Sequence, residues 1–288
     1  MKARVLPFAI CATGSLVLAG GTIPVAADET SSAADLDIAA LSLRLPNEEK
    51  VSFAALPNDA TVAGDPGSML YAGPLPVALI EVAAHGAFES HKQANEKKTK
   101  NSLNDIVLAP YQGSLSHFTN AELMRRALDG LPTHGTKVLV QYSEKAGVGW
   151  LIECSPRFFM TPDARALVLQ NDIVIHSPDA ASPATFKNVV EVVGPPRDSV
   201  GKDSENTWMV QDGAVLTGAS VDLLRESLSL ALSELRGDFA GPARAFHTVR
   251  YPRGGEEKME RAQTLRQTPQ RVVLKTLRGW IMSVPAAA

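Results

Sequence analysis

Two segments of this sequence repeat apolar residues at helical spacing, and strand-like segments lie before, between and after them. The helices are predicted at about 120–131 and 221–236. Strands that follow one another through short turns pair antiparallel, whereas parallel strands need a crossover connection, usually a helix. Most of the strand-like segments follow one another with no helix between them. The order of elements therefore predicts an α+β fold, in which two main amphipathic helices accompany a largely antiparallel sheet.

Both predicted helices carry signals at their ends. Thr119 can cap the first helix, and Glu122, three residues later, completes a capping-box pattern. Gly130 lies where this helix is expected to end. In the second helix, Ser220 is the expected N-cap and Gly237 the expected stop.

The strand-like segments are short stretches in which apolar or β-branched residues alternate with polar ones or form a brief apolar run. They are 77–83, 138–142, 150–154, 166–169, 173–176, 189–193, 208–210, 244–251 and 271–284. In one of them Cys154 shares a strand face with Trp150 and Ile152. Because cysteine often packs as a small apolar side chain, we expect Cys154 to be a buried structural residue and not a nucleophile.

The N-terminus has the three-part pattern of a cleavable secretory signal peptide. Lys2 and Arg4 precede an uncharged apolar run at 5–19, and small residues precede Asp28. We therefore predict that 1–27 is removed on export. The expected location is the periplasm, with secretion or peripheral attachment to the cell envelope as alternatives.

The rest of the chain is expected to form two parts. Proline and glycine recur at 28–75, which predicts an extended arm with one short strand near 51–56. The stretch 76–288 has the length of one domain and is predicted to be a single α+β globular domain.

The composition argues against several classes of protein. Removing Lys2 and Arg4 changes the formal net charge from −3 to −5, and an acidic chain is a poor partner for nucleic acid. No other apolar run has membrane-spanning length, so no transmembrane segment is expected after signal cleavage. Cys154 is the one cysteine outside the signal peptide, which excludes an intramolecular disulfide. Glycine-rich phosphate-binding motifs are absent, and no cofactor is predicted.

His85, Glu89 and His91 form the one close cluster of histidines and a carboxylate. Such groups bind transition metals, so these three residues are the candidate metal ligands. Their spacing matches no known metal-binding signature, and a solvated turn is the other interpretation. No catalytic residue is assigned.

The C-terminal stretch is rich in cations. Its basic residues are Arg253, Lys258, Arg261, Arg266, Arg271, Lys275 and Arg278. The first four of these are a candidate face for an anionic partner: Arg253, Lys258, Arg261 and Arg266. The alternative is a solvated sheet edge, where charged side chains discourage aggregation.

Together these features predict an exported protein of the cell envelope that acts as a non-enzymatic binding or structural interaction domain. The expected partner is an envelope protein or an anionic envelope polymer. The alternative is a periplasmic hydrolase that uses His85, Glu89 or His91, with or without a metal. The oligomeric state is not predicted.

Overall fold

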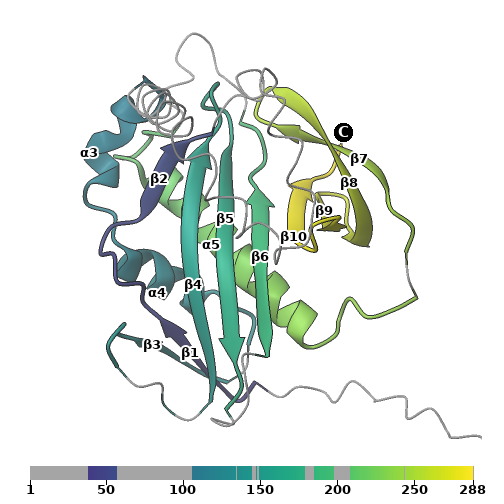
Figure 1. Cartoon of the computed structure of the whole chain (residues 1–288). Coiled ribbons are helices and arrows are strands. Elements are labelled where there is room, and N and C mark those ends of the chain that lie inside the picture. The colour runs from purple at the N-terminus through teal and green to yellow at the C-terminus, as the bar shows by residue number, and fades with distance from the viewer. Residues whose placement is uncertain are drawn as a thin grey trace, which may run out of the picture. The chain divides into compact units, whose positions relative to one another are not determined.

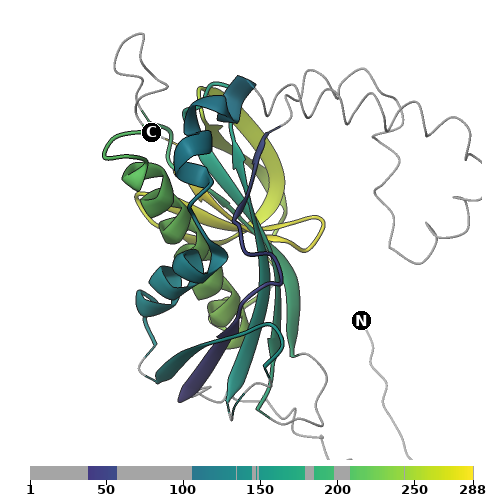
Figure 2. The same cartoon turned by 90° about the vertical axis from the view of Figure 1, so that its left-hand side faces the viewer.

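A mixed ten-stranded sheet forms the centre of the computed structural model, and helices cover one of its faces (Figures 1 and 2). The structure describes residues 38–56, 106–133, 135–144, 147, 149–178, 185–197, 208–242 and 244–287. The strands are β1 (Ala40–Arg44), β2 (Ser52–Ala55), β3 (Thr136–Val140), β4 (Trp150–Met160), β5 (Leu167–His176), β6 (Phe186–Val193), β7 (His247–Arg253), β8 (Glu256–Gln267), β9 (Arg271–Thr276) and β10 (Ile281–Pro285). The helices are η3 (Ala109–Tyr111), α3 (Gln112–Leu115), α4 (Asn120–Asp129) and α5 (Ala214–Leu235).

The strand order is β3-β1-β4-β5-β6-β10-β9-β8-β7, and β2 lies beside β4. The predicted α+β class is confirmed, but the sheet is mixed. β1 pairs parallel with β3 and β4, β2 pairs parallel with β4, and β10 pairs parallel with β6. These parallel pairs join strands that are separated along the chain by α3 and α4 or by α5, because helices provide the crossovers that parallel strands need.

β1 and β2 lie within 28–75, where the composition predicts an extended arm. β2 is the short strand expected near 51–56, whereas β1 was not expected. Leu41 and Leu43 of β1 are buried in the main core. The described part of this segment, 38–56, is therefore part of the sheet, and 57–75 lies outside the described residues.

The chain leaves the sheet between β1 and β2. β1 pairs with β4 up to Glu153, and β2 pairs with it from Arg157 onward. Pro156 lies between these two pairings and has no N–H to donate to a neighbouring strand. The excursion is held by the buried Asn120, whose Nδ2 donates to the carbonyls of Glu48 at 2.9 Å and Lys50 at 3.0 Å. The start of α4 thus fixes the break in this strand.

α4 begins where the sequence predicts. The Thr119 side chain accepts a hydrogen bond from the Glu122 backbone N–H at 3.2 Å, which confirms the N-cap. The Glu122 carboxylate pairs with Arg126 at 3.1 Å and does not close a capping box. The helix ends at Asp129 with Gly130 as its C-cap, slightly before the predicted end.

α5 begins well before the predicted start, and Ser220 is not its N-cap. Gly213 takes that position with a φ of 84°, in the left-handed region that favours glycine. Ser220 lies inside the helix, where its hydroxyl donates to the Leu216 carbonyl at 2.9 Å. α5 contacts β5, β6 and α4, and its buried residues cover more than half of its circumference. The expectation of two main amphipathic helices is therefore not confirmed. No helix within the described ranges is both long enough and apolar enough to cross a membrane.

The two faces of the sheet differ. α4 and α5 pack on one face over the main core, and in Figure 1 the opposite face of β4, β5 and β6 is turned to the viewer. A second, smaller cluster lies on this opposite face, because Val168 alternates along β5 with Leu167 and Leu169 of the main core. Its buried members are Val168, Val193, Tyr251, Ala262, Val272, Leu274, Met282 and Val284. β7 contacts β10 although β8 and β9 separate them in the sheet, so the C-terminal strands curl around this second cluster.

Candidate ligand-binding site

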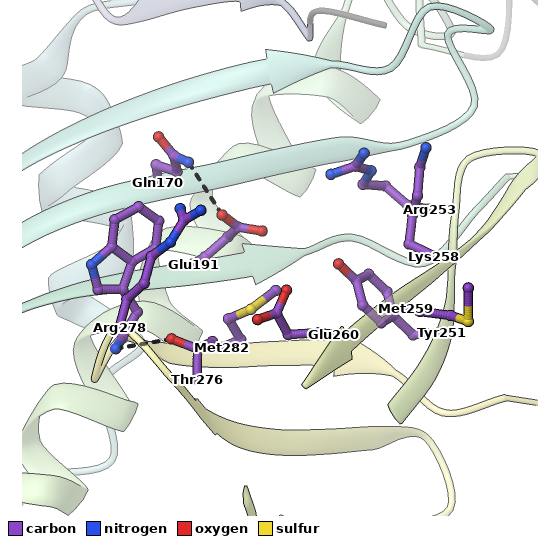
Figure 3. A pocket seen from close by; sticks show the side chains of 11 residues that line it. Gln170, Glu191, Tyr251, Arg253, Lys258, Met259, Glu260, Thr276, Arg278 and Met282 are labelled. Carbon is purple, nitrogen blue, oxygen red and sulfur yellow. Dashed lines mark hydrogen bonds between the residues drawn. The ribbon is translucent and has the colours of Figure 1, made fainter. Parts of the chain in front are cut away.

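The curled strands line a half-open pocket of about 360 Å³, which we call the inner pocket (Figure 3). It is lined by side chains from all six strands from β5 to β10 and from the turn that joins β9 to β10. These residues are Gln170, Glu191, Tyr251, Arg253, Lys258, Met259, Glu260, Thr276, Arg278, Trp280 and Met282. Five of these eleven residues are charged, and both signs occur among them.

Two carboxylates lie in the middle of the inner pocket (Figure 3). Glu191 is buried on β6 and accepts a hydrogen bond from Gln170 Nε2 at 3.2 Å. Burial raises the pKa of Glu191, and the neighbouring Glu260 adds to this effect, while Gln170, Arg253 and Arg278 oppose it. Burial also raises the pKa of Glu260, against the opposing effect of Arg278. Among the described residues, no cation lies within ion-pair distance of either carboxylate.

Arg253 and Lys258 lie together at one end of the inner pocket (Figure 3). They flank the turn of the β7–β8 hairpin. Lys258 Nζ lies 2.6 Å from the carboxylate of Glu256, which is opposite Arg253 in the strand register. The hairpin thus brings two cations to this end of the pocket, and Glu256, which pairs with Lys258, is not part of the lining.

The β9–β10 turn presents Arg278 and Trp280 at the other end of the inner pocket. Gly279 has a φ of 82°, and its carbonyl accepts a hydrogen bond from Asn188 Nδ2 at 3.0 Å. The Trp280 backbone N–H donates to the Thr276 hydroxyl at 3.2 Å. The Arg278 guanidinium lies 5.3 Å from the centre of the Trp280 ring, a cation–π contact. These contacts fix the position of Arg278 beside the carboxylates.

Asp163, in the turn between β4 and β5, holds the tip of the β7–β8 hairpin. Its carboxylate accepts hydrogen bonds from the Thr161 hydroxyl at 2.6 Å, the Arg165 N–H at 3.1 Å and the Gly255 N–H at 2.5 Å. Burial alone would raise the pKa of Asp163, but these bonds and the charge of Arg165 together lower it. Gly254, with a φ of 65°, lets the hairpin turn approach this carboxylate closely. The contact keeps Arg253 and Lys258 over the pocket.

The structure brings together only part of the basic face predicted from the sequence. Arg253 and Lys258 line the inner pocket, whereas Arg261 alternates with Lys258 and Glu260 along β8 and so lies on the opposite face. Arg266 lies 5.7 Å from the ring centre of Phe239, which follows α5.

Two further cations of the stretch bind α5. Lys275 Nζ pairs with Glu234 at 3.1 Å. Arg271 donates to the Ser283 hydroxyl at 2.7 Å and lies 3.8 Å from Glu226. Arg271 and Lys275 therefore connect the C-terminal strands to α5 and do not line the inner pocket.

Sequence reasoning missed the two pocket carboxylates. Glu191 and Glu260 are far apart in the chain, and the strands bring them together only in the folded sheet. One signal was present in the sequence. Glu191 interrupts the apolar run of 189–193, and charged side chains are rarely buried in such a strand unless they have a partner.

Other sequence candidates fall elsewhere. His85, Glu89 and His91 lie outside the described residues, within which no group of three metal-ligating side chains occurs. Cys154 is 6% exposed in the main core, and burial raises its pKa to about 12. The prediction that Cys154 is buried is therefore confirmed, and its raised pKa disfavours the thiolate that a nucleophile needs.

A second depression, of about 670 Å³, lies along β1, β4 and β5. Three of its four charged side chains, Arg44, Glu153 and Asp172, form ion pairs. Arg44 and Glu153 form an ion pair, and His176 Nε2 lies 3.3 Å from the same Glu153 carboxylate. Arg157 pairs with Asp172 at 2.9 Å nearby. The inner pocket, whose carboxylates lack such pairs within the described ranges, is the better candidate for a ligand.

No protein-family model, no curated protein and no solved structure matches the chain.

Proposed function

We propose that this chain is an exported protein of the cell envelope whose inner pocket binds a small polar ligand without converting it. The observation that carries this proposal is the convergence of charged side chains from several strands on one cavity. Its volume of about 360 Å³ lies within the range of small-molecule sites, which is about 300–1,000 Å³. The predicted signal peptide supports export, and the periplasm is the compartment we propose.

The basic residues of the C-terminal stretch lie on two opposite faces of the sheet, which favours a compact ligand over an extended polymer. An anionic polymer would need neighbouring cations along one surface. Arg253 and Lys258 are separated by the sheet from Arg261, and Arg271 and Lys275 are engaged by α5. Arg253, Lys258 and Arg278 instead share a pocket with two carboxylates.

A hydrolase is the second candidate function, and one observation favours it. Glu191 and Glu260 both have raised pKa values in the same pocket, and carboxyls that titrate closer to neutral pH serve as general acids. A hydrolase that uses His85, Glu89 or His91 gains no support from the described residues.

A thermal-shift screen tests the binding function. The purified, exported chain is mixed with a panel of amino acids, dipeptides, hexoses, hexuronates, polyamines and phosphate. We expect at least one compound to raise the melting temperature of the wild type, because a ligand that binds only the folded state stabilises it. The rise should be lost in the double variant Glu260→Gln with Arg278→Gln.

Arg261→Gln is the matched control, because Arg261 lies on the opposite face of the same strand as Glu260. This variant should respond to the compound as the wild type does. If no compound shifts the melting temperature, or if the shift survives in the double variant, the inner pocket is not the site. If mass spectrometry shows that the protein converts the bound compound to a hydrolysis product, the chain is a hydrolase and not a binding protein.

A further inference from the structure

The inner pocket has hydrogen-bond acceptors and donors side by side. Glu191 and Glu260, whose carboxylates accept hydrogen bonds, lie in the middle of the pocket, and Arg278, whose guanidinium donates them, lies beside them (Figure 3). The charge of Arg278 opposes the rise in the pKa of both carboxylates, so the three groups are close enough to act on one another. Within the described ranges, none of the three is held in an ion pair.

Most of the hydrogen-bonding capacity of these three groups is not used by the described parts of the chain. Glu191 accepts one hydrogen bond, from Gln170 Nε2 at 3.2 Å. The half-buried Glu260 accepts none among the described residues, and Arg278 donates none to them, although it contacts the Trp280 ring. A carboxylate has several acceptor positions, and a guanidinium has several N–H donors. A ligand can therefore both donate and accept hydrogen bonds at this part of the pocket wall.

The mixture of charges favours a neutral ligand over a singly charged one. An anion in the middle of the pocket is repelled by the carboxylates, and the attraction for a cation is weak, because Arg278 offsets one carboxylate charge and burial disfavours the charge of Glu191. A hydroxyl group carries no charge and is both a donor and an acceptor, so it can donate to a carboxylate and accept from Arg278. Such charge-assisted hydrogen bonds are stronger than those between neutral groups. Neighbouring hydroxyls on one ring match this set of groups.

The rest of the pocket wall suits the carbon face of such a ring. Tyr251 and Met282, which are buried in the second cluster, line the same pocket, and the Trp280 ring lies beside Arg278. A sugar ring exposes C–H groups between its hydroxyls, and aromatic and methionine side chains bury apolar surface of this kind. Small-molecule sites commonly combine an apolar wall with a few placed polar groups.

Resting on the proposed binding function, we propose that the ligand of the inner pocket is a neutral monosaccharide. Its hydroxyls donate to Glu191 and Glu260 and accept from Arg278, and its carbon face lies against Tyr251 and Met282. The volume of about 360 Å³ is near the lower end of the range of small-molecule sites, which suits one sugar ring and not a chain of rings.

Calorimetric titration of the purified, exported chain with neutral hexoses tests this ligand class. The probes are glucose, galactose and mannose, and the control compound is tetrahydropyran-2-methanol, which keeps the ring and lacks the ring hydroxyls. We expect at least one hexose to bind the wild type, and the control compound to bind at least about tenfold more weakly, because it loses charge-assisted hydrogen bonds. Glucuronate and glucosamine, which add one negative and one positive charge to the same ring, are titrated in parallel.

Variants of the pocket locate the bound hexose. Glu260→Gln and Arg278→Gln should each weaken its binding about tenfold, because each replaces a charge-assisted hydrogen bond by a neutral one. Glu257→Gln and Arg261→Gln make the same two chemical changes on the opposite face of β8 and should bind the hexose as the wild type does. Arg278 lies in an exposed turn, so Arg278→Gln should keep the melting temperature of the unliganded wild type and carry the test even if Glu260→Gln does not fold.

The results separate this proposal from the function on which it rests. If glucuronate or glucosamine binds and no neutral hexose does, the site selects for charge and the monosaccharide proposal is wrong. It is also wrong if the control compound binds as tightly as the hexose, or if the pocket variants bind the hexose as the wild type does. If no hexose binds but another compound of the screen raises the melting temperature, only the monosaccharide proposal fails. If no compound does so, both proposals fail.

Discussion

Asp163 and Glu191 are carboxylates whose pKa values shift in opposite directions, and Asp163 is exposed whereas Glu191 is buried. Asp163 accepts three hydrogen bonds, two of them from backbone N–H groups, and its pKa is lowered. Glu191 accepts one, from Gln170, and its pKa is raised by burial. The greater burial of Glu191 and its smaller number of hydrogen bonds both raise its pKa relative to that of Asp163. Ionised Asp163 thus stabilises the folded state, whereas ionised Glu191 lowers its stability.

Asp163→Asn should destabilise the folded chain at pH 7 by about 1–2 kcal/mol, because an amide presents a donor to backbone N–H groups and carries no charge, while solvent at this exposed position weakens each contact. The contribution of a group with a lowered pKa is present above the unfolded pKa, about 3.9, and is lost as the pH falls through the folded value. Urea unfolding of wild type and variant at pH 7 and at pH 3 measures this. The difference should shrink at pH 3.

Asp172→Asn is the control for this measurement. Asp172 forms an exposed ion pair with Arg157, and such pairs contribute about 0–1 kcal/mol. An equal loss of stability in both variants, or the same loss at both pH values for Asp163→Asn, would contradict the anchoring role of Asp163.

Glu191→Gln should raise the melting temperature at pH 7. The pKa of Glu191 is raised in the folded state, so its ionised form costs stability above that pKa and costs nothing below the unfolded value of about 4.3. The gain should therefore be present at pH 7 and absent at pH 4. Calorimetric melting of both proteins at the two pH values measures it. A lower melting temperature of the variant at pH 7 would show that Glu191 has a stabilising partner.

At the scale of elements, the local signal at the start of α4 predicted the helix correctly, whereas the start of α5 and the long-range strand pairing were not predicted. α4 was predicted because its cap, Thr119, lies next to the helix in the chain. The start of α5 was missed because Gly213 caps it without a side chain, and because Ser220 bonds within the helix instead. β1 was missed because its five residues lie in a proline-rich stretch, and its parallel partners are set by contacts far along the chain.

Asn120 makes a testable link between two such elements. Asn120→Ala should remove both bonds to the carbonyls of Glu48 and Lys50 and leave these groups without their partner. We expect a loss of about 2–3 kcal/mol in the free energy of unfolding, since unpaired buried polar groups are costly.

Thr119→Ala, which removes only the helix cap, should cost about 1 kcal/mol and serves as the comparison for Asn120→Ala. Urea denaturation gives both values. Equal losses in the two variants would show that the break between β1 and β2 does not depend on Asn120.

At the scale of the molecule, the candidate site depends on how the sheet curls. The basic C-terminal stretch predicted a face that includes Arg253 and Lys258, and both residues line the inner pocket. The sequence could not show that Arg261 faces away from Lys258, because no strand was predicted over 256–267, and only alternation along β8 places the two on opposite faces. It also could not place Glu191 beside Glu260, because β9 and β10 lie between their strands in the sheet. Curvature of this kind is a property of the assembled strands.

Export is the prediction that concerns the whole chain. We expect the protein recovered from the periplasm to begin at Asp28, because small residues at Val25-Ala26-Ala27 follow an apolar run of the length that signal peptidase substrates share. The intact mass of the recovered protein shows at which residue it begins.

Ala27→Leu, which places a bulky residue directly before the cleavage position, should leave an uncleaved species of full mass. Ala26→Leu, at the neighbouring position where size matters less, should be cleaved like the wild type. A full-length wild-type protein in the membrane fraction would contradict export by cleavage, and with it the proposed periplasmic location.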